Sequence, residues 1–151
     1  MKRQEIPAVR IFPMSDRIPG FRNRSIEDVQ QRLFLRDLPA RQGRFRYRST
    51  GLSTPPGTVV LFQFRARIIA TARFVRDERF DRPVKDTSGV LHVDPASIRT
   101  FDPVDAATMK LVWPAFRNFG HVKQRLNPGR FPAFKRRLRQ VRIPTRQQAP
   151  A

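Results

Sequence analysis

The chain of 151 residues contains no cysteine, one tyrosine, one tryptophan and two histidines. The absence of cysteine excludes disulfide bonds, thiolate metal sites and thiol nucleophiles. No apolar run approaches the roughly 18 residues of a membrane span, and the N-terminal stretch MKRQEIPAVRIF lacks the apolar core of a signal peptide. We therefore expect a soluble, cytoplasmic protein that has no membrane partner.

Acidic residues are also scarce. Only 12 Asp and Glu stand against 31 Lys and Arg, of which 26 are arginine, and the formal net charge is +19. So large a charge opposes a compact fold by self-repulsion unless a polyanion neutralises it. Arginine in particular grips phosphate bidentately and stacks on bases. The composition predicts a nucleic-acid partner, and the alternative is a simple compositional preference for arginine in an ordinary soluble domain.

Groups that catalyse reactions or bind metal ions are sparse. His92 and His121 are far apart in the sequence and have no metal-binding spacing around them. The densest acidic segment, VRDERFDR, we interpret as a loop with internal ion pairs rather than as a magnesium site. No phosphate-cradling glycine loop or nucleophile elbow is present. We expect no metal, no cofactor and no catalysis by this chain alone.

The apolar content is sufficient for one packed core, because 39% of the residues are hydrophobic and 13 are phenylalanine. We expect one domain over residues 1–143 and a flexible tail over 144–151. The expected class is α+β, a small β-barrel of about five to six strands with two or three flanking helices. The expected strands are 8–12, 44–49, 58–64, 67–75, 89–93 and 97–101.

Capping residues and prolines predict the helices. Ser25, followed three residues later by Asp28, predicts a helix that runs to about Phe34 and is closed by Leu38-Pro39. Asp102-Pro103 predicts the start of a second helix that ends near residue 111. PAFKRRLRQV (132–141) predicts a third, basic helix.

The central segment PPGTVVLFQFRARIIATARFV resembles the barrel hairpin of PUA-like domains, the superfamily that includes the EVE, YTH, ASCH and SRA domains. IPAVRIFPMS, RYRSTGL and FDPVDAATMKLVWPAFRNFGHVKQRLNP are similar to the EVE-like N-terminal half of bacterial HNH restriction endonucleases that read modified DNA. The chain departs from the pattern at Ala70, where the second strand often carries glycine, and it lacks a tryptophan near the N-terminus.

The resemblance implies a non-catalytic reader of nucleic acid, with DNA favoured over RNA. It implies a flipped modified base held in an aromatic pocket, where stacking and hydrogen bonds offset the cost of unstacking. An RNA-binding PUA-like domain is the alternative of the same kind. A specificity subunit for a separately encoded nuclease, or a hydrolase, is the alternative of a different kind.

Alternating arginines and aromatics in RFRYRS (44–49) provide the first candidate nucleic-acid-binding residues. On a strand, this alternation places the arginines on one face and the rings on the other. Tyr47 next to hydroxyl-bearing residues favours base stacking, so Tyr47→Ala would lower base preference whereas Arg46→Ala would lower affinity for all sequences. A half-buried strand tyrosine is the alternative. The candidates here are Arg44, Arg46, Tyr47, Arg48, Ser49 and Thr50.

The C-terminal third supplies a second group of candidates. The single tryptophan lies in the aromatic stretch WPAFRNF and is a candidate wall of a base pocket, although core packing at a helix end is the alternative. The basic helix has an apolar stripe on one side and positive charges on the other. The charged side could contact phosphate groups, and the alternative is an ordinary solvated helix face. The candidates here are Trp113, Lys123, Arg125, Arg136, Arg137 and Arg139.

Overall fold

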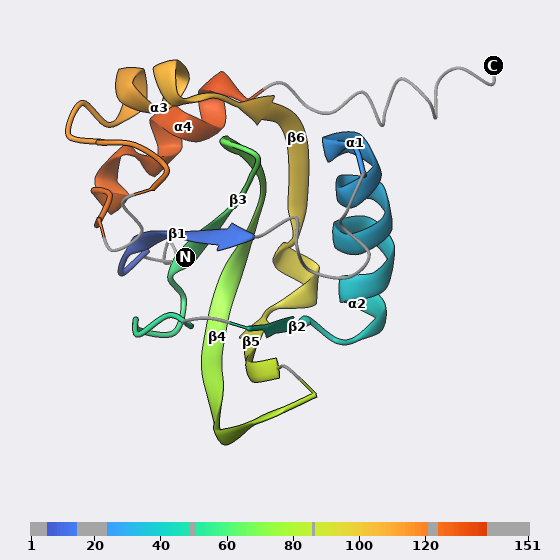
Figure 1. Ribbon diagram of the computed structural model, residues 1–151. Coiled ribbons are helices and arrows are strands. Elements are labelled where there is room, and N and C mark those ends of the chain that lie inside the picture. The colour runs from blue at the N-terminus through green and yellow to red at the C-terminus, as the bar shows by residue number, and fades with distance from the viewer. Residues whose placement is uncertain (1–5, 15–23, 49–50, 86, 121–123, 139–151) are drawn as a thin grey trace, which may run out of the picture.

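The computed structural model describes residues 6–14, 24–48, 51–85, 87–120 and 124–138. In these residues the chain has the predicted α+β class, with one six-stranded mixed sheet and helices on both of its sides (Figure 1). Within the described ranges, no helix is both long enough and apolar enough to cross a membrane. The predicted tail, 144–151, lies outside the described residues.

The sheet has the strand order β1-β3-β4-β5-β2, and β6 also pairs with β4. β1 runs parallel to β3, and every other pairing is antiparallel. β5 and β6 pair with successive parts of the long strand β4, and a 3-10 turn, η2 (Pro95–Ser97), separates them. The strands are β1 (Val9–Met14), β2 (Arg44–Tyr47), β3 (Val59–Phe64), β4 (Arg67–Val84), β5 (Thr87–Val93) and β6 (Arg99–Val104).

The predicted closed barrel is wrong, because the two end strands of the sheet, β1 and β2, share no hydrogen-bond ladder. The sheet curls until these strands meet through side chains instead. The ring of Phe12 on β1 lies 5.5 Å from that of Phe45 and 6.1 Å from that of Tyr47, both edge to face. Aromatic packing therefore fills the place where a closed barrel would have backbone hydrogen bonds.

The side of the sheet enclosed by this curl, the inner face, carries one hydrophobic cluster. On β3, Val60, Phe62 and Phe64 point into this inner cluster, as period-two alternation requires. The N-terminal helical segment covers it with Leu33 and Phe34. That segment consists of α1 (Ile26–Val29), the π-helical η1 (Gln30–Asp37) and α2 (Leu38–Ala40).

This helical segment begins as predicted but does not end as predicted. The Ser25 side chain accepts a 3.0 Å hydrogen bond from the backbone N–H of Asp28, which confirms the expected cap. The prediction that Leu38-Pro39 closes the helix is wrong, since helical backbone continues to Ala40. The Leu38 N–H bonds to the carbonyl of Leu33, five residues back, and the wider π turn relieves the crowding that a proline ring causes in an α-helix.

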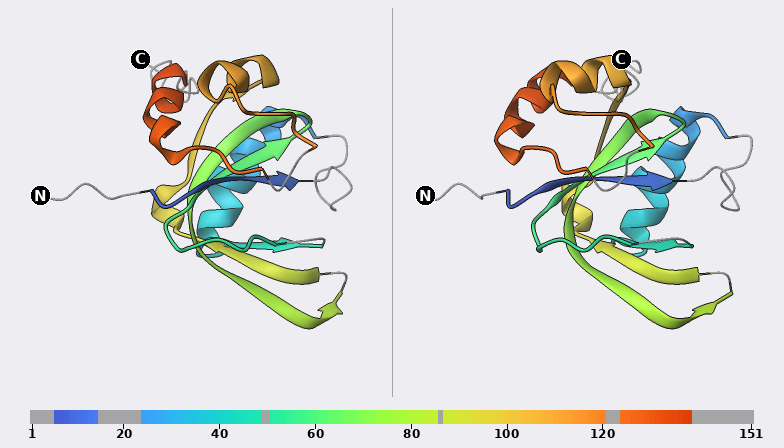
Figure 2. Two further views of the ribbon diagram at one scale, coloured as in Figure 1. Left: turned by 90° about the vertical axis from the view of Figure 1, so that its left-hand side faces the viewer. Right: turned by 60° about the vertical axis from the view of Figure 1, so that its left-hand side comes forward.

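The opposite side of the sheet, the outer face, carries a second cluster. Val59 and Leu61 of β3 point into this outer cluster, so the central strand is buried on both faces. Two short helices cover it, α3 (Ala106–Val112) and α4 (Phe131–Arg137), the second after a 3-10 turn, η3 (Pro128–Arg130). Figure 2 shows α3 and α4 on one side of the sheet and the N-terminal helical segment on the other.

Both C-terminal helices differ from their predicted bounds. Asp102 and Pro103 belong to β6, because pairing of Ile68 with Val104 extends that edge strand past the proline. The cap of α3 is Asp105, whose carboxylate accepts a 2.9 Å hydrogen bond from the Thr108 N–H. α4 ends at Arg137 with Leu138 as its C-cap, and the rest of the predicted helix lies outside the described residues.

The segment VRDERFDR is a strand and not the predicted loop. It is the second half of β4, which pairs with β5 as far as Val84 opposite Thr87. The prediction missed it because few of its side chains are buried. Backbone pairing with β5 holds a strand whose side chains show no apolar alternation.

Candidate nucleic-acid interface

β2 shows the predicted alternation between arginines and rings. Arg44 and Arg46 are exposed, whereas Phe45 and Tyr47 are each only 3% exposed. β2 pairs with β5 alone, so it forms one edge of the sheet. Arg48, directly after the strand, is also exposed. The sheet therefore presents these arginines to solvent from one edge.

Cross-strand pairing extends this surface over three strands. Arg44 lies opposite His92 of β5, which in turn lies opposite Arg76 of β4. In the next row, Arg46 lies opposite Val90, which lies opposite Glu78. Paired residues share one face of a sheet, and Phe45 between the two rows belongs to the inner cluster. We call this part of the outer face the basic face. Its exposed residues are Arg44, Arg46, Arg76 and Glu78, and the buried Val90 and the partly buried His92 lie between them.

Glu78 is the carboxylate of the basic face. His92 Nε2 lies 2.9 Å from its Oε1, and Arg76 Nη1 lies 4.0 Å from the same atom. The hydrogen bond with His92 lowers the pKa of Glu78, and the charges of Arg76, His92 and Arg44 act in the same direction. Glu78 is therefore ionised at neutral pH. It offsets only part of the charge of the three arginines.

Tyr47 lies on the opposite face from these arginines. Its hydroxyl group donates a 2.5 Å hydrogen bond to Asp77 Oδ1, and Arg79 Nε donates a 3.2 Å bond to the other oxygen. Burial raises the pKa of Tyr47, and the bond to Asp77 raises it further. The predicted role of Tyr47 as a stacking platform is therefore not supported, because its ring lies in the inner cluster. Ser49 and Thr50, predicted to assist it, lie outside the described residues.

Trp113 is also part of a core. It is 2% exposed, its ring centroid lies 5.3 Å from that of Phe134, and its Nε1 donates a 2.9 Å hydrogen bond to the carbonyl of Asn127. A buried indole whose N–H is satisfied by backbone holds the α3 end against α4. The ring is not available to wall an exposed base pocket. The core-packing alternative for Trp113 is the one that the structure shows.

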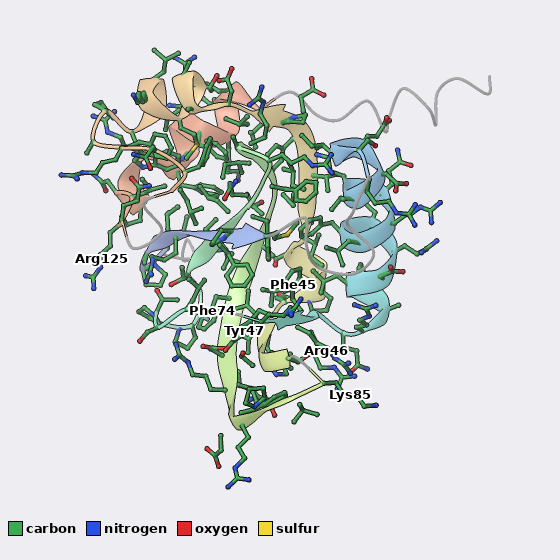
Figure 3. The ribbon with its side chains drawn as sticks, in the orientation of Figure 1. Phe45, Arg46, Tyr47, Phe74, Lys85 and Arg125 are labelled. Carbon is green, nitrogen blue, oxygen red and sulfur yellow. The ribbon has the colours of Figure 1, made fainter. Side chains whose placement is uncertain are left out.

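Arg125 lies apart from the basic face, at the far edge of the sheet beside the start of β1 (Figure 3). Burial of Arg10 lowers the pKa of its guanidinium group, and the nearby positive charge of Arg125 lowers it further. Arg10 Nη1 donates to the carbonyl of Ser53 at 3.2 Å, while its buried Nε has no hydrogen-bond partner among the described residues. Arg10 and Arg125 thus form a second basic spot, which is separate from the basic face.

Arg136 and Arg137 are exposed on α4, on the outer side of the sheet. Lys123 and Arg139 lie outside the described residues. The structure thus divides the predicted site into three places, which are the edge strand β2, the helix α4 and the Arg125 edge. Sequence analysis missed Arg76 because it assigned that residue to a loop, and the charged side chains of this segment show no alternation that would mark a strand.

In the described part of the chain, no group of three or more His, Asp or Glu side chains is arranged to hold a metal ion. The chain matches no protein-family model, no curated protein and no solved structure. The PUA-like resemblance therefore stays a prediction. Function must be argued from the site itself.

Proposed function

We propose that this protein is a nucleic-acid-binding module that holds the phosphate backbone of DNA on its basic face. The observation that carries the proposal is the group of exposed arginines on β2 and β4, in a chain of net charge +19. Glu78 is the one acidic residue among the six that define the basic face. Arginine forks suit phosphate oxygens, and many such contacts give sequence-independent affinity. Because residues are regularly spaced along a strand, the arginines are held at fixed intervals.

Strand geometry supports this role in a second way. The rings of Phe45 and Tyr47 are buried behind the arginines, so the edge strand is anchored to the core and its outward side chains start from a rigid backbone. A rigid scaffold lowers the entropy lost when the arginines engage a ligand. Because Tyr47 and Trp113 are in the cores, we restrict the proposal to backbone binding and leave the modified-base pocket out of it.

The test is fluorescence anisotropy of a labelled DNA duplex across a salt series, with single-stranded DNA and RNA of matched sequence as competitors. We expect the wild type to bind at ~50 mM salt, and its log affinity to fall linearly with log salt. Arg44→Gln combined with Arg46→Gln should reduce the slope by about 0.9 for each phosphate that the variant no longer neutralises.

The matched control removes two arginines from the other side of the sheet. Arg32 and Arg36 are exposed on η1 and pair with Asp28 and Asp37. Arg32→Gln combined with Arg36→Gln lowers the net charge equally and should leave the slope nearly unchanged. Equal losses in both double variants would mean that net charge, and not the basic face, binds. The proposal fails outright if the wild type binds none of the three nucleic acids at low salt.

A further inference from the structure

A pocket of about 300 Å³ opens on the outer side of the sheet, between β4, β6 and α4. Its strand wall includes Thr71, Arg73 and Arg99, and α4 contributes Phe131 and Lys135. Register places these strand residues on one face, because Thr71 pairs with both Leu61 and Arg99, and Arg73 pairs with Val59. Its volume is at the lower end of the range for small-ligand sites.

Three cations line this pocket, and none of them is paired with a carboxylate in the described part of the chain. Arg73 Nη1 donates a 2.9 Å hydrogen bond to the carbonyl of Gly57. Arg99 Nη1 donates to the carbonyls of Ala96 and Ile98, at 3.0 and 2.8 Å. Carbonyls fix the two guanidinium groups without neutralising them. Each therefore keeps its full charge and further N–H donors for a ligand.

The remaining lining is apolar or hydroxyl-bearing. Val59, Phe101 and Phe131 belong to the outer cluster and form an apolar wall. Thr71 is 7% exposed and contributes a hydroxyl-bearing side chain to the lining. Lys135 is the third cation, 5.9 Å from the centroid of the Phe131 ring. The pocket thus combines a cationic part with an apolar part and contains no acidic side chain among its described lining residues.

We propose that this pocket binds the phosphate monoester of a single nucleotide. A monoester carries close to two negative charges, and two arginine forks with an ammonium group complement it better than they complement a monoanion. The apolar wall takes the sugar or the base. The same chemistry has two sources, which are a free mononucleotide and the 5′-phosphorylated end of a nucleic-acid strand.

This assignment does not rest on binding of DNA to the basic face. None of the three cations belongs to that face, and a free mononucleotide needs no second contact. The two proposals therefore fail independently. Loss of duplex affinity in the β2 double variant tests the basic face, whereas titration with a mononucleotide tests the pocket.

The experiment is isothermal titration of the full chain with a nucleoside monophosphate and, separately, with the corresponding nucleoside. We expect the monophosphate to bind and the nucleoside to bind at least about tenfold more weakly, since the nucleoside lacks the charge-assisted hydrogen bonds. Arg99→Gln and Lys135→Gln should each weaken monophosphate binding about tenfold. Lys110→Gln on α3, an exposed lysine outside the pocket, should leave it unchanged.

Competition between 5′-phosphorylated and 5′-hydroxyl oligonucleotides of one sequence then separates the two sources. A preference for the phosphorylated strand that Lys135→Gln removes assigns the pocket to strand ends, and equal binding of the two strands assigns it to free nucleotides. The proposal is overturned if the monophosphate binds no better than the nucleoside, or if Lys135→Gln and Lys110→Gln have the same effect. Lys135 is exposed, so its substitution tests the pocket without threatening the fold.

Discussion

Tyr47 and Asp77, 30 residues apart in the sequence, are joined by a 2.5 Å hydrogen bond at the margin of the inner cluster. The side chain of Asp77 is itself only 9% exposed, and Arg79 is the second partner of its carboxyl group. The bond connects the edge strand β2 to the long strand β4 across the intervening β5. The only tyrosine of the chain thus has a structural role that its position beside arginines did not reveal.

Removal of this hydroxyl group should destabilise the fold. Tyr47→Phe keeps the ring but leaves Asp77 with one partner fewer, and a hydrogen bond to a charged group contributes about 1.5–3 kcal/mol. We expect urea unfolding at neutral pH to show a loss of about 2 kcal/mol in the free energy of unfolding. Affinity for a DNA duplex, measured on the folded variant, should not change. A change in base preference with unaltered stability would instead restore the stacking role.

The same tyrosine should make stability depend on alkaline pH. Because the folded pKa of Tyr47 is raised above its ordinary value of 10.0, the neutral hydroxyl form is favoured by folding. The contribution of the Tyr47 hydroxyl group to the free energy of unfolding is complete below pH 10. It is lost progressively as the pH rises from 10 through the raised pKa of the folded state. Phenolate absorbance should titrate near pH 10 only in the unfolded chain, where it reports this one tyrosine. The wild type and Tyr47→Phe should converge in stability at high pH.

The tyrosine ring also requires a glycine on the neighbouring strand. Gly89 of β5 is the register partner of Tyr47, and a Cβ at this position would overlap the Tyr47 hydroxyl group and meet the Glu78 carbonyl at 2.6 Å. Gly89→Ala should therefore cost about 1–3 kcal/mol, the range for overpacking a core. The matched control is Gly120→Ala, whose new methyl group meets only the Asn118 side-chain oxygen, at 3.2 Å. Thermal unfolding of both variants measures the difference.

Local patterns predicted the elements that bury side chains with a clear period. The apolar run of β3 and the alternation of β2 placed these strands correctly, since period two follows from the backbone. The second half of β4 has charged side chains on both faces, so no pattern marks it as a strand. Pairing with β5 makes this segment a strand, and no short stretch of the sequence by itself reveals that pairing.

The candidate site was predictable to the same extent. The alternation in RFRYRS places the arginines on the solvent side, but it cannot tell whether the rings on the other face are buried or free to stack on a base. That depends on Asp77 and Gly89, which reach Tyr47 only through strand pairing. Trp113 is similar, since Phe134 and Asn127 contact it from distant segments. Charge is therefore a better sequence signal of this surface than aromatic rings.

The turn between β3 and β4 leaves room for stabilisation. Arg65 and Ala66 have φ angles of 52° and 59°, the left-handed region that two-residue hairpins favour and that side chains with a Cβ disfavour. Ala66→Gly removes a penalty of roughly 1–2 kcal/mol in the folded state but increases the entropy of the unfolded chain. We expect a net gain of up to about 1 kcal/mol in unfolding free energy. Ala96→Gly, at an exposed position without positive φ, should give no gain.

The acidic member of the basic face provides the sharpest functional prediction. Glu78 repels phosphate and pairs with His92 and Arg76, so Glu78→Gln both removes a negative charge and frees Arg76 from its ion pair. We expect duplex DNA affinity to rise about threefold at ~50 mM salt, as for one exposed charge at high dielectric. The gain should shrink as salt rises, because the Debye length falls to ~8 Å at physiological ionic strength.

The control for this gain is Glu27→Gln. Glu27 is an exposed carboxylate on α1, across the sheet from the basic face, and its neutralisation raises the net charge by the same amount. If binding depends on where charge lies, anisotropy titrations will show the gain for Glu78→Gln and little for Glu27→Gln. Equal gains would show that phosphate responds to the total charge of the protein. A loss of affinity in Glu78→Gln would mean that Glu78 positions Arg76 for phosphate, since the ion pair would then orient the guanidinium rather than compete with phosphate for it.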